Sequence, residues 1–104
     1  MIIVMGHAKF AGGEIERLEN TLKAQIAATN AEDGCEAYSF ARDVTDPDRM
    51  VVSEHWRDQA AIDAHFRTAH MTHFNAELGK SKVVELSIKS FDLATGEIKQ
   101  LMGG

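Results

Sequence analysis

The hydrophobic and polar positions of this chain change their period several times, and each change marks the border of an element. Between residues 83 and 93, the apolar residues Val84, Leu86 and Ile88 alternate with polar neighbours, and three other short segments are rich in apolar residues. Alternation and short apolar runs bounded by turn residues are typical of β-strands. Four strands are therefore predicted, at residues 2–10, 35–42, 50–56 and 83–93.

A long helix is predicted between the first two strands. Its apolar residues recur at spacings of three and four, which places them on one face of a helix. These residues are Ile15, Leu18, Leu22 and Ile26. Acidic residues in the first turn suit the positive end of a helix dipole. The helix is expected to end at Asp33-Gly34, because glycine accepts the left-handed conformation of many helix ends.

A second helical segment separates the last two predicted strands. Asp58 is placed to cap its first turn, and Ile62 and Phe66 share one face. The pattern shifts at residues 68–70. We therefore expect a bend there, followed by a second short helix that ends at Gly79.

The order of these elements is β-α-β-β-α-β. This is the ferredoxin-like arrangement of the α+β class, an antiparallel sheet with its helices on one face. A chain of 104 residues has the size of one domain, so residues 1–104 are expected to form a single one. The tail, residues 94–104, is expected to add a short strand or to dock on its own subunit or on a partner.

The first strand is apolar on both of its sides. By alternation, Ile3 and Met5 point to one side, while Ile2 and Val4 point to the other. Two helices cover only one face of such a sheet, and soluble monomers rarely expose a large apolar patch. The sequence therefore predicts a homodimer that packs sheet to sheet.

The net charge and the cysteine content limit which kinds of partner and which cellular compartment are expected. The formal net charge of −5 at pH 7 argues against nucleic acid and against anionic membrane surfaces. Cys35 is the only cysteine, so no internal disulfide forms, which fits a reducing compartment. The apolar opening at residues 2–5 is too short for a signal peptide, and no run is long enough to cross a membrane. We expect a cytoplasmic protein whose partner is a small aromatic substrate.

The candidate chemistry gathers in residues 54–74, which hold the only tryptophan and four of the five histidines. An indole offers a flat wall to an aromatic ligand, and imidazoles titrate near neutral pH. Alternation places Glu54 and Trp56 on one face of their strand. If that face meets the helices, both residues line a cavity there. The other residues expected around this cavity are His7, Tyr38, Phe66 and His73.

His65 and His70 are the candidate catalytic residues. One imidazole could take the proton of a phenolic hydroxyl while the other stabilises the resulting anion. The alternatives are structural: both histidines could bond backbone carbonyls at the bend, and Trp56 could be a core anchor. The spacings from His65 to His70 and from His70 to His73 are five and three, unlike a helical zinc pair. No carboxylate completes a ligand pattern, so no metal site is predicted.

Four motifs follow one another within residues 2–92. They are Asp33-Gly34-Cys35 with Tyr38, Ser53-Glu54-His55-Trp56, Ala61-Ile62-Asp63-Ala64-His65-Phe66, and Thr68-Ala69-His70-Met71-Thr72-His73-Phe74. In order and spacing the chain resembles the antibiotic biosynthesis monooxygenase domain family. The resemblance implies a dimeric α/β barrel of ferredoxin-like subunits. It also implies oxidation of quinols or polycyclic phenols by dioxygen, without metal, flavin or haem.

The resemblance assigns roles by position. Trp56 and His65 match pocket positions of the family, and His70 matches its histidine at the helix bend. His7 departs from the family, because many relatives carry a small or apolar residue there. A haem-degrading branch has asparagine at the position of His7 and tryptophan at that of His65. These two changes argue against haem degradation, while haem ligation by a histidine stays an alternative.

The sequence thus predicts a cofactor-independent monooxygenase that acts on a quinol-like or polyphenolic compound. The alternative is a dimer that binds a small ligand, or serves in a stress response, without catalysis. The alternative stands because a fold of this kind hosts many functions.

Overall fold

Five antiparallel strands form one sheet in the computed structural model, which describes residues 1–104. Their order across the sheet is β2-β3-β1-β4-β5, so the apolar strand predicted first lies at the centre. The strands are β1 (Ile2–Phe10), β2 (Cys35–Asp43), β3 (Asp46–Trp56), β4 (Val83–Asp92) and β5 (Ile98–Gly103). The predicted α+β ferredoxin-like fold is confirmed.

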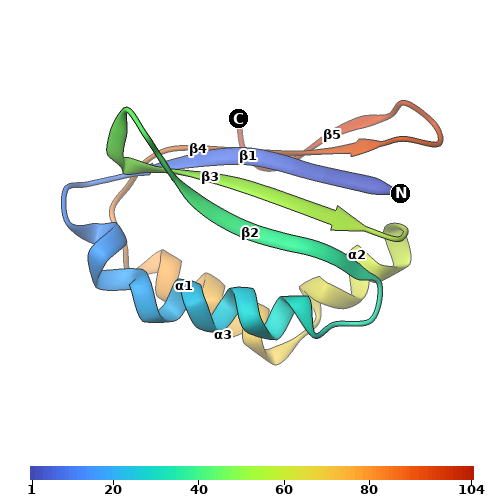
Figure 1. The fold of residues 1–104 in the computed structure, drawn as a ribbon, viewed down its shortest axis with the longest axis horizontal. Coiled ribbons are helices and arrows are strands. Elements are labelled where there is room, and N and C mark those ends of the chain that lie inside the picture. The colour runs from blue at the N-terminus through green and yellow to red at the C-terminus, as the bar shows by residue number, and fades with distance from the viewer.

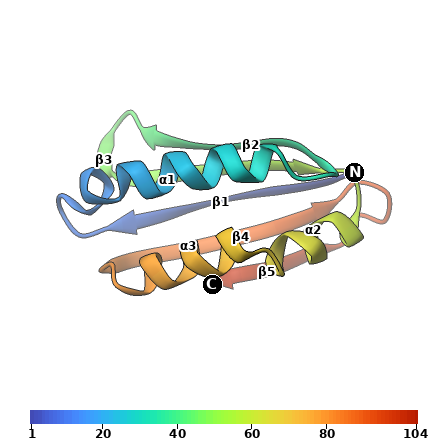
Figure 2. The ribbon, with the colours of Figure 1, turned by 90° about the horizontal axis from the view of Figure 1, so that it is seen from below.

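Three helices cover one face of this sheet and leave the other face open (Figure 1). They are α1 (Glu14–Asn30), α2 (Gln59–Phe66) and α3 (Ala69–Gly79). Figure 2 shows α1 along the β2–β3 side of the sheet, with α2 and α3 along the β4–β5 side. No helix is both long enough and apolar enough to cross a membrane.

The predicted bend between α2 and α3 is confirmed, and a side-chain cap begins each of the two helices. The carboxylate of Asp58 accepts a hydrogen bond from the Ala61 backbone N–H and starts α2. The hydroxyl of Thr68 accepts one from the Met71 backbone N–H and starts α3 in a new direction. Such caps satisfy amide groups that the first turn of a helix leaves unpaired.

Two boundaries differ from those expected. Helix α1 ends at Asn30 rather than at Gly34, and Gly34 occupies the turn into β2 with φ of 84°. A Cβ atom there would lie 2.6 Å from that of Ala61, so close packing also selects glycine. Strand β3 begins at Asp46, four residues early. Its first residues, Pro47 included, extend past β1, whose pairing with β3 stops at Lys9 and Arg49.

The two faces of β1 are occupied as alternation predicts. Ile2 and Val4 are buried against the helices, whereas Ile3 is partly exposed and Met5 is 51% exposed on the open face. The pairing register places Phe91 of β4 beside Ile3. An apolar strip therefore runs along the uncovered face of the sheet.

The tail forms β5, which pairs with β4 of its own chain, Met102 opposite Ile88. Leu101 and Met102 also pack against the core under the helices. Of the alternatives for the tail, the structure shows an added strand on the same subunit.

Candidate functional site

A cavity of about 70 Å³ lies between the sheet and the helices. Its wall is apolar along most of its length, with Phe10, Phe74 and Leu78 among the lining residues. Polar atoms enter it only from Glu54, His65 and the phenol of Tyr38. An apolar pocket with a few convergent titratable groups is the usual form of a small-molecule site.

The strands bring Tyr38 and Glu54 together from distant parts of the sequence. The two residues are direct partners across β2 and β3, so their side chains share one face. Trp56 follows two residues after Glu54 on that face, and it is fully buried. Its indole N–H donates a hydrogen bond of 2.9 Å to the Glu54 carboxyl. Glu54 and Trp56 are thus buried on the face of β3 that meets the helices.

His65 enters from α2 and is surrounded by aromatic rings. Its ring centre lies 4.8 Å from the Trp56 ring, 5.8 Å from the Tyr38 ring and 5.5 Å from the Phe66 ring. Phe66 is half-exposed and also lines the cavity. The structure thus gathers the rings of Trp56, Tyr38 and Phe66 around His65, and of these four residues only Trp56 does not line the cavity.

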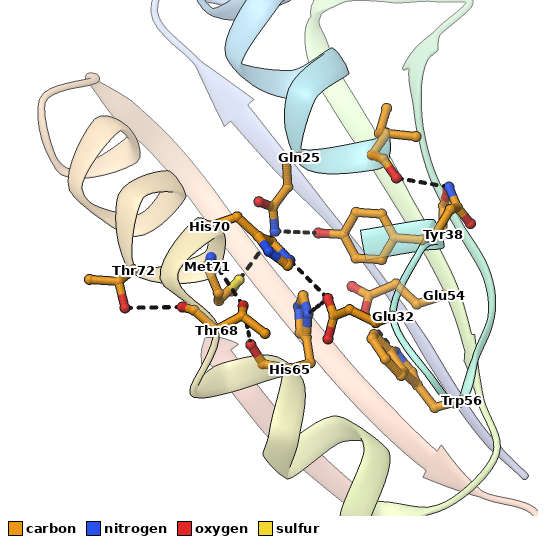
Figure 3. Close-up of polar contacts among 12 residues, drawn as sticks. Gln25, Glu32, Tyr38, Glu54, Trp56, His65, Thr68, His70, Met71 and Thr72 are labelled. Carbon is orange, nitrogen blue, oxygen red and sulfur yellow. Dashed lines mark hydrogen bonds and ion pairs between the residues drawn. The ribbon is translucent and has the colours of Figure 1, made fainter. Parts of the chain in front are cut away.

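His65 and His70 do not bond backbone carbonyls at the bend. Both rings instead meet Oε2 of Glu32, which lies in the loop after α1 (Figure 3). The distances are 2.7 Å to Nδ1 of His65 and 2.8 Å to Nε2 of His70. Because a carboxylate only accepts hydrogen bonds, Nδ1 of His65 and Nε2 of His70 carry the protons. We refer to Glu32, His65 and His70 as the Glu-His-His cluster.

This bonding pattern leaves Nε2 of His65 with its lone pair free. The ring makes no other hydrogen bond, and His65 lines the cavity. A carboxylate that holds one imidazole nitrogen fixes the ring orientation and stabilises the imidazolium that forms when the other nitrogen takes a proton. Glu32 and His65 are therefore arranged as a carboxylate–imidazole pair suited to general-base chemistry.

Glu54 is the second acid–base group of the cavity. Its burial raises the pKa of the carboxyl to about 7, although the hydrogen bond from Trp56 acts in the opposite direction, and the charge of Glu32 raises it further. A carboxyl group that is partly protonated at neutral pH can both donate and accept hydrogen bonds. Such shifts are common at sites that move protons.

Tyr38 stays neutral, and its hydroxyl accepts a hydrogen bond from Gln25. Burial raises the pKa of its phenol well above the ordinary value, and the charge of Glu54 adds to this effect. The buried amide of Gln25 reaches both the Tyr38 hydroxyl, at 3.5 Å, and the sulfur of Met71, at 3.3 Å. Figure 3 shows this amide between α1, β2 and α3.

Three of the predicted pocket residues are not in the cavity wall. Trp56 is fully buried and packs beside His65, but it does not line the cavity. His7 is on the open face of the sheet, where its ring lies 3.9 Å from the Glu85 carboxylate. By alternation, His7 points to the same side of β1 as Ile3 and Met5. The helices cover the opposite side. His73 is exposed on α3 and is not in the cavity wall. It follows His70 by three residues, yet the ring of His70 turns toward Glu32.

Sequence reasoning missed Glu32 and Gln25. Gln25 lies one turn after Leu22 on the apolar side of α1, so a polar residue within a buried helical face was a usable signal. Glu32 gave no such signal, because it lies in a loop and 33 residues separate it from His65. For the same reason, the spacing argument about metal ligands did not include the carboxylate that joins the two histidines. The three ligand atoms lie within 4.8 Å of one another and could hold a metal ion.

The fold and the composition of the site define a ferredoxin-like domain with an aromatic pocket and a carboxylate–imidazole pair. The sequence profile of the antibiotic biosynthesis monooxygenase family matches residues 1–77. The chain therefore belongs to this family, as its motifs predicted.

Two curated relatives show how far the similarity extends. An uncharacterised protein from Synechocystis is 33% identical over 73 residues, which are 70% of this chain and 50% of that protein. A candidate monooxygenase from Mycobacterium tuberculosis is 33% identical over 63 residues, which are 61% of this chain and 61% of that protein. The chain thus spans about half the length of the first relative.

Solved structures agree with the fold. A candidate antibiotic biosynthesis monooxygenase from Deinococcus radiodurans has a TM-score of 0.82 at 27% identity, covering 99% of this chain and 100% of that one. A protein from Pseudomonas aeruginosa has a TM-score of 0.78 at 29% identity, covering 86% of this chain and 90% of that one. The family and its named relatives are consistent with monooxygenase activity, and none of the names states a substrate.

Proposed function

We propose that this protein is a monooxygenase that oxidises a quinol-like or polyphenolic compound with dioxygen, the substrate itself supplying the electrons. One observation carries the proposal: Glu32 bonds one nitrogen of His65, the other nitrogen has no hydrogen-bond partner, and this residue lines an apolar cavity beside the Trp56 indole. His65 is the base, and Trp56 backs the wall against which the ring lies. Tyr38 and Glu54 bind the substrate oxygens, and His70 keeps Glu32 in place.

The reaction begins with transfer of the phenolic proton to Nε2 of His65. The aryloxide gives one electron to dioxygen, and the aryloxyl radical combines with superoxide at a ring carbon that carries hydrogen. The peroxide is protonated, that carbon loses its proton, and the C–H electron pair forms a carbonyl as the O–O bond breaks. The outer oxygen leaves as water. A phenol and dioxygen thus become a quinone and water, with four electrons transferred.

The pocket supports each step by simple means. Deprotonation raises the electron density of the ring, and the pair of Glu32 and His65 makes it possible near neutral pH. The apolar wall keeps water from the radical pair and from the peroxide. Holding the ring and dioxygen together removes much of the entropic cost of their encounter.

The cavity volume requires that the pocket widens for this substrate. About 70 Å³ is less than the roughly 150 Å³ of a cavity known to hold benzene. The wall includes the half-exposed ring of Phe66 and the edge-strand residues Leu101 and Met102. Because Phe66 is half-exposed and β5 lies at the edge of the sheet, we assign the opening to these side chains.

Oxygen uptake by protein treated with a chelator tests the proposal. A panel of hydroquinones and hydroxynaphthalenes is supplied to the wild type and to three variants. We expect His65→Ala to lower kcat by about 10²–10⁴-fold. Trp56→Phe should raise KM more than it lowers kcat, and His73→Ala should match the wild type. Absence of turnover above background with every compound would overturn the proposal.

The same proposal includes a homodimer formed through the open face of the sheet. Met5 and Val51 are exposed there in the single chain, and the partly buried Ile3 and Phe91, which are direct partners across β1 and β4, lie on the same face. Burying such a strip against a second copy removes apolar surface from water at about 25 cal/mol per Å². The dimer would leave the helix-covered pocket of each subunit intact.

The small cavity favours a second candidate function, binding of a small apolar ligand without chemistry. A space of about 70 Å³ accommodates a short apolar group but no aromatic ring. Isothermal titration with hydroquinones and with short alcohols separates the two functions. Tight binding of the alcohols, together with no oxygen uptake, would favour the second.

A further inference from the structure

We propose that the Glu-His-His cluster is a binding site for a divalent first-row transition metal ion, of the Zn²⁺ or Fe²⁺ class. Two imidazoles and one carboxylate are a ligand set that such ions take in proteins, with open positions left for water. Only the expected effect of the metal on turnover rests on the proposed monooxygenase function. The binding itself stands without it.

The three ligand atoms already converge from three segments. Nδ1 of His65 and Nε2 of His70 lie 2.7 and 2.8 Å from one oxygen of Glu32, and all three lie within 4.8 Å of one another. Bonds of about 2.0–2.2 Å to a tetrahedral ion would set the ligand atoms about 3.3 Å apart. To reach this spacing, the Glu32 carboxylate moves away from both nitrogens, and the His65 and His70 rings turn so that their nitrogens come closer together.

The surroundings favour a cation over an empty cluster. Glu32 is 12% exposed, and its partners His65 and His70 are 3% and 28% exposed. No lysine or arginine forms an ion pair with Glu32, so only the two imidazoles answer its charge. Glu54 adds a second acidic group close enough for the two carboxyls to interact. Charges drawn into a partly buried site interact more strongly than those in water.

The Glu-His-His cluster is reachable from solvent on the side of His70. His70 is the most exposed of the three ligands, and Figure 3 shows it on the opposite side of Glu32 from Trp56. A hydrated ion can therefore enter past His70 and keep one or two of its waters. It replaces the protons on Nδ1 of His65 and Nε2 of His70. Metal binding at such ligands releases protons and weakens as the pH falls.

Metal binding and base chemistry compete for the ring of His65. With Nδ1 bound to the ion, the neutral imidazole carries its proton on Nε2 and cannot accept another from a substrate. If the proposed oxidation occurs, Zn²⁺ is therefore expected to inhibit it, and a chelator should restore it.

Titration with Zn²⁺ tests the site, using full-length protein freed of any histidine tag and of bound metal. Calorimetry should show one ion per chain, and Co²⁺ should give visible absorption bands that Zn²⁺ displaces. Loss of an outer-shell partner costs about 10–100-fold in affinity, so loss of a ligand in Glu32→Gln or His70→Ala should cost about 100-fold or more. His73→Ala, which removes an exposed histidine three residues from His70, should bind like the wild type.

Circular dichroism checks that each variant is folded, and only variants that retain the wild-type spectrum are compared. Glu32→Gln also preserves the shape of the side chain. Zn²⁺ affinity unchanged by both Glu32→Gln and His70→Ala would overturn the site, as would no saturable binding below millimolar Zn²⁺. Oxygen uptake in a chelator without Zn²⁺ binding would defeat the metal site alone. Zn²⁺ binding without oxygen uptake would defeat the proposed function alone.

Discussion

A histidine lies beside a carboxylate on each side of the sheet, and the two pairs differ in burial and in distance. On the helix-covered side, His65 is nearly fully buried, and its nitrogen lies 2.7 Å from Glu32. On the open side, His7 is 31% exposed, and its nitrogen lies 3.9 Å from Glu85. Glu85 also lies 3.6 Å from Arg49, so its charge is shared.

The difference shows that the depth of a histidine, and not its presence, decides its chemistry here. An exposed ion pair gains little, because water and salt screen it and the side chains lose freedom. The part-buried Glu32 carboxylate, whose only ion-pair partners are the two imidazoles, holds them in one geometry. The pocket therefore has a fixed base, while the open face has a solvated histidine next to an apolar strip.

The largest expected effect is on the stability of the covered face. Trp56→Ala should lower the free energy of unfolding by about 3–5 kcal/mol, because it leaves a cavity and removes the hydrogen bond to Glu54. Urea denaturation measures this change. Val44→Ala at the exposed hairpin tip should alter it by less than about 0.5 kcal/mol. Equal losses in the two variants would contradict the assignment of Trp56 to the core.

A smaller effect concerns Glu54 and pH. The pKa of Glu54 rises from 4.5 to about 7 on folding, so between these values the folded state holds the proton more tightly than the unfolded state. The contribution of Glu54 to the free energy of unfolding should therefore be fully present below about pH 4.5. It should fall by about 3 kcal/mol as the pH rises past 7.

The variant Glu54→Gln isolates this contribution. Its amide oxygen still accepts the hydrogen bond from Trp56, but it does not titrate. Denaturation at pH 5 and pH 8, at one protein concentration, should show a smaller loss for Glu54→Gln than for the wild type. The same loss in both proteins would mean that Glu54 does not gain its proton on folding.

On the open face, the effect should appear in assembly. Met5→Asp places a charge in the apolar strip and should weaken a dimer by about tenfold or more, roughly 1.4 kcal/mol. Light scattering after gel filtration gives the mass. Val44→Asp introduces the same charge at the hairpin tip and should leave the mass unchanged. A wild-type protein that is monomeric at high concentration would refute the dimer.

The smallest effect should come from the exposed histidine pair. His7→Ala should change the free energy of unfolding by about 0.5 kcal/mol or less, and less still at high salt. It should also leave Zn²⁺ affinity and oxygen uptake unaltered, whereas His65→Ala changes both. A loss of uptake in His7→Ala would place His7 in the site after all.

Much of the fold could be predicted because it depends on local pattern. The spacing of Ile15, Leu18 and Leu22 predicted α1, and the cap at Asp58 predicted the start of α2. Boundaries were less certain where long-range packing decides them. Gly34 looked like a helix end, yet it serves a turn whose close contact with Ala61 no local pattern reveals.

The site divides in the same way. Alternation alone placed Trp56 and Glu54 on one face, and helical spacing placed His65 near Phe66. Which face of the sheet meets the helices was not in the pattern, because β1 is apolar on both sides, and His7 was therefore assigned to the wrong one. Glu32 could not be found from the sequence, since a loop residue 33 positions before His65 meets it only after folding.

The sequence by itself determined the elements, the fold class and the rings available for chemistry, since these follow from periodicities of two and 3.6 residues along the chain. Tertiary structure alone decided that one part-buried carboxylate joins two histidines and that one of these histidines lines the cavity. Such contacts depend on packing between segments distant in sequence. Burial then gives the Glu-His-His cluster an electrostatic strength that the same residues lack in water.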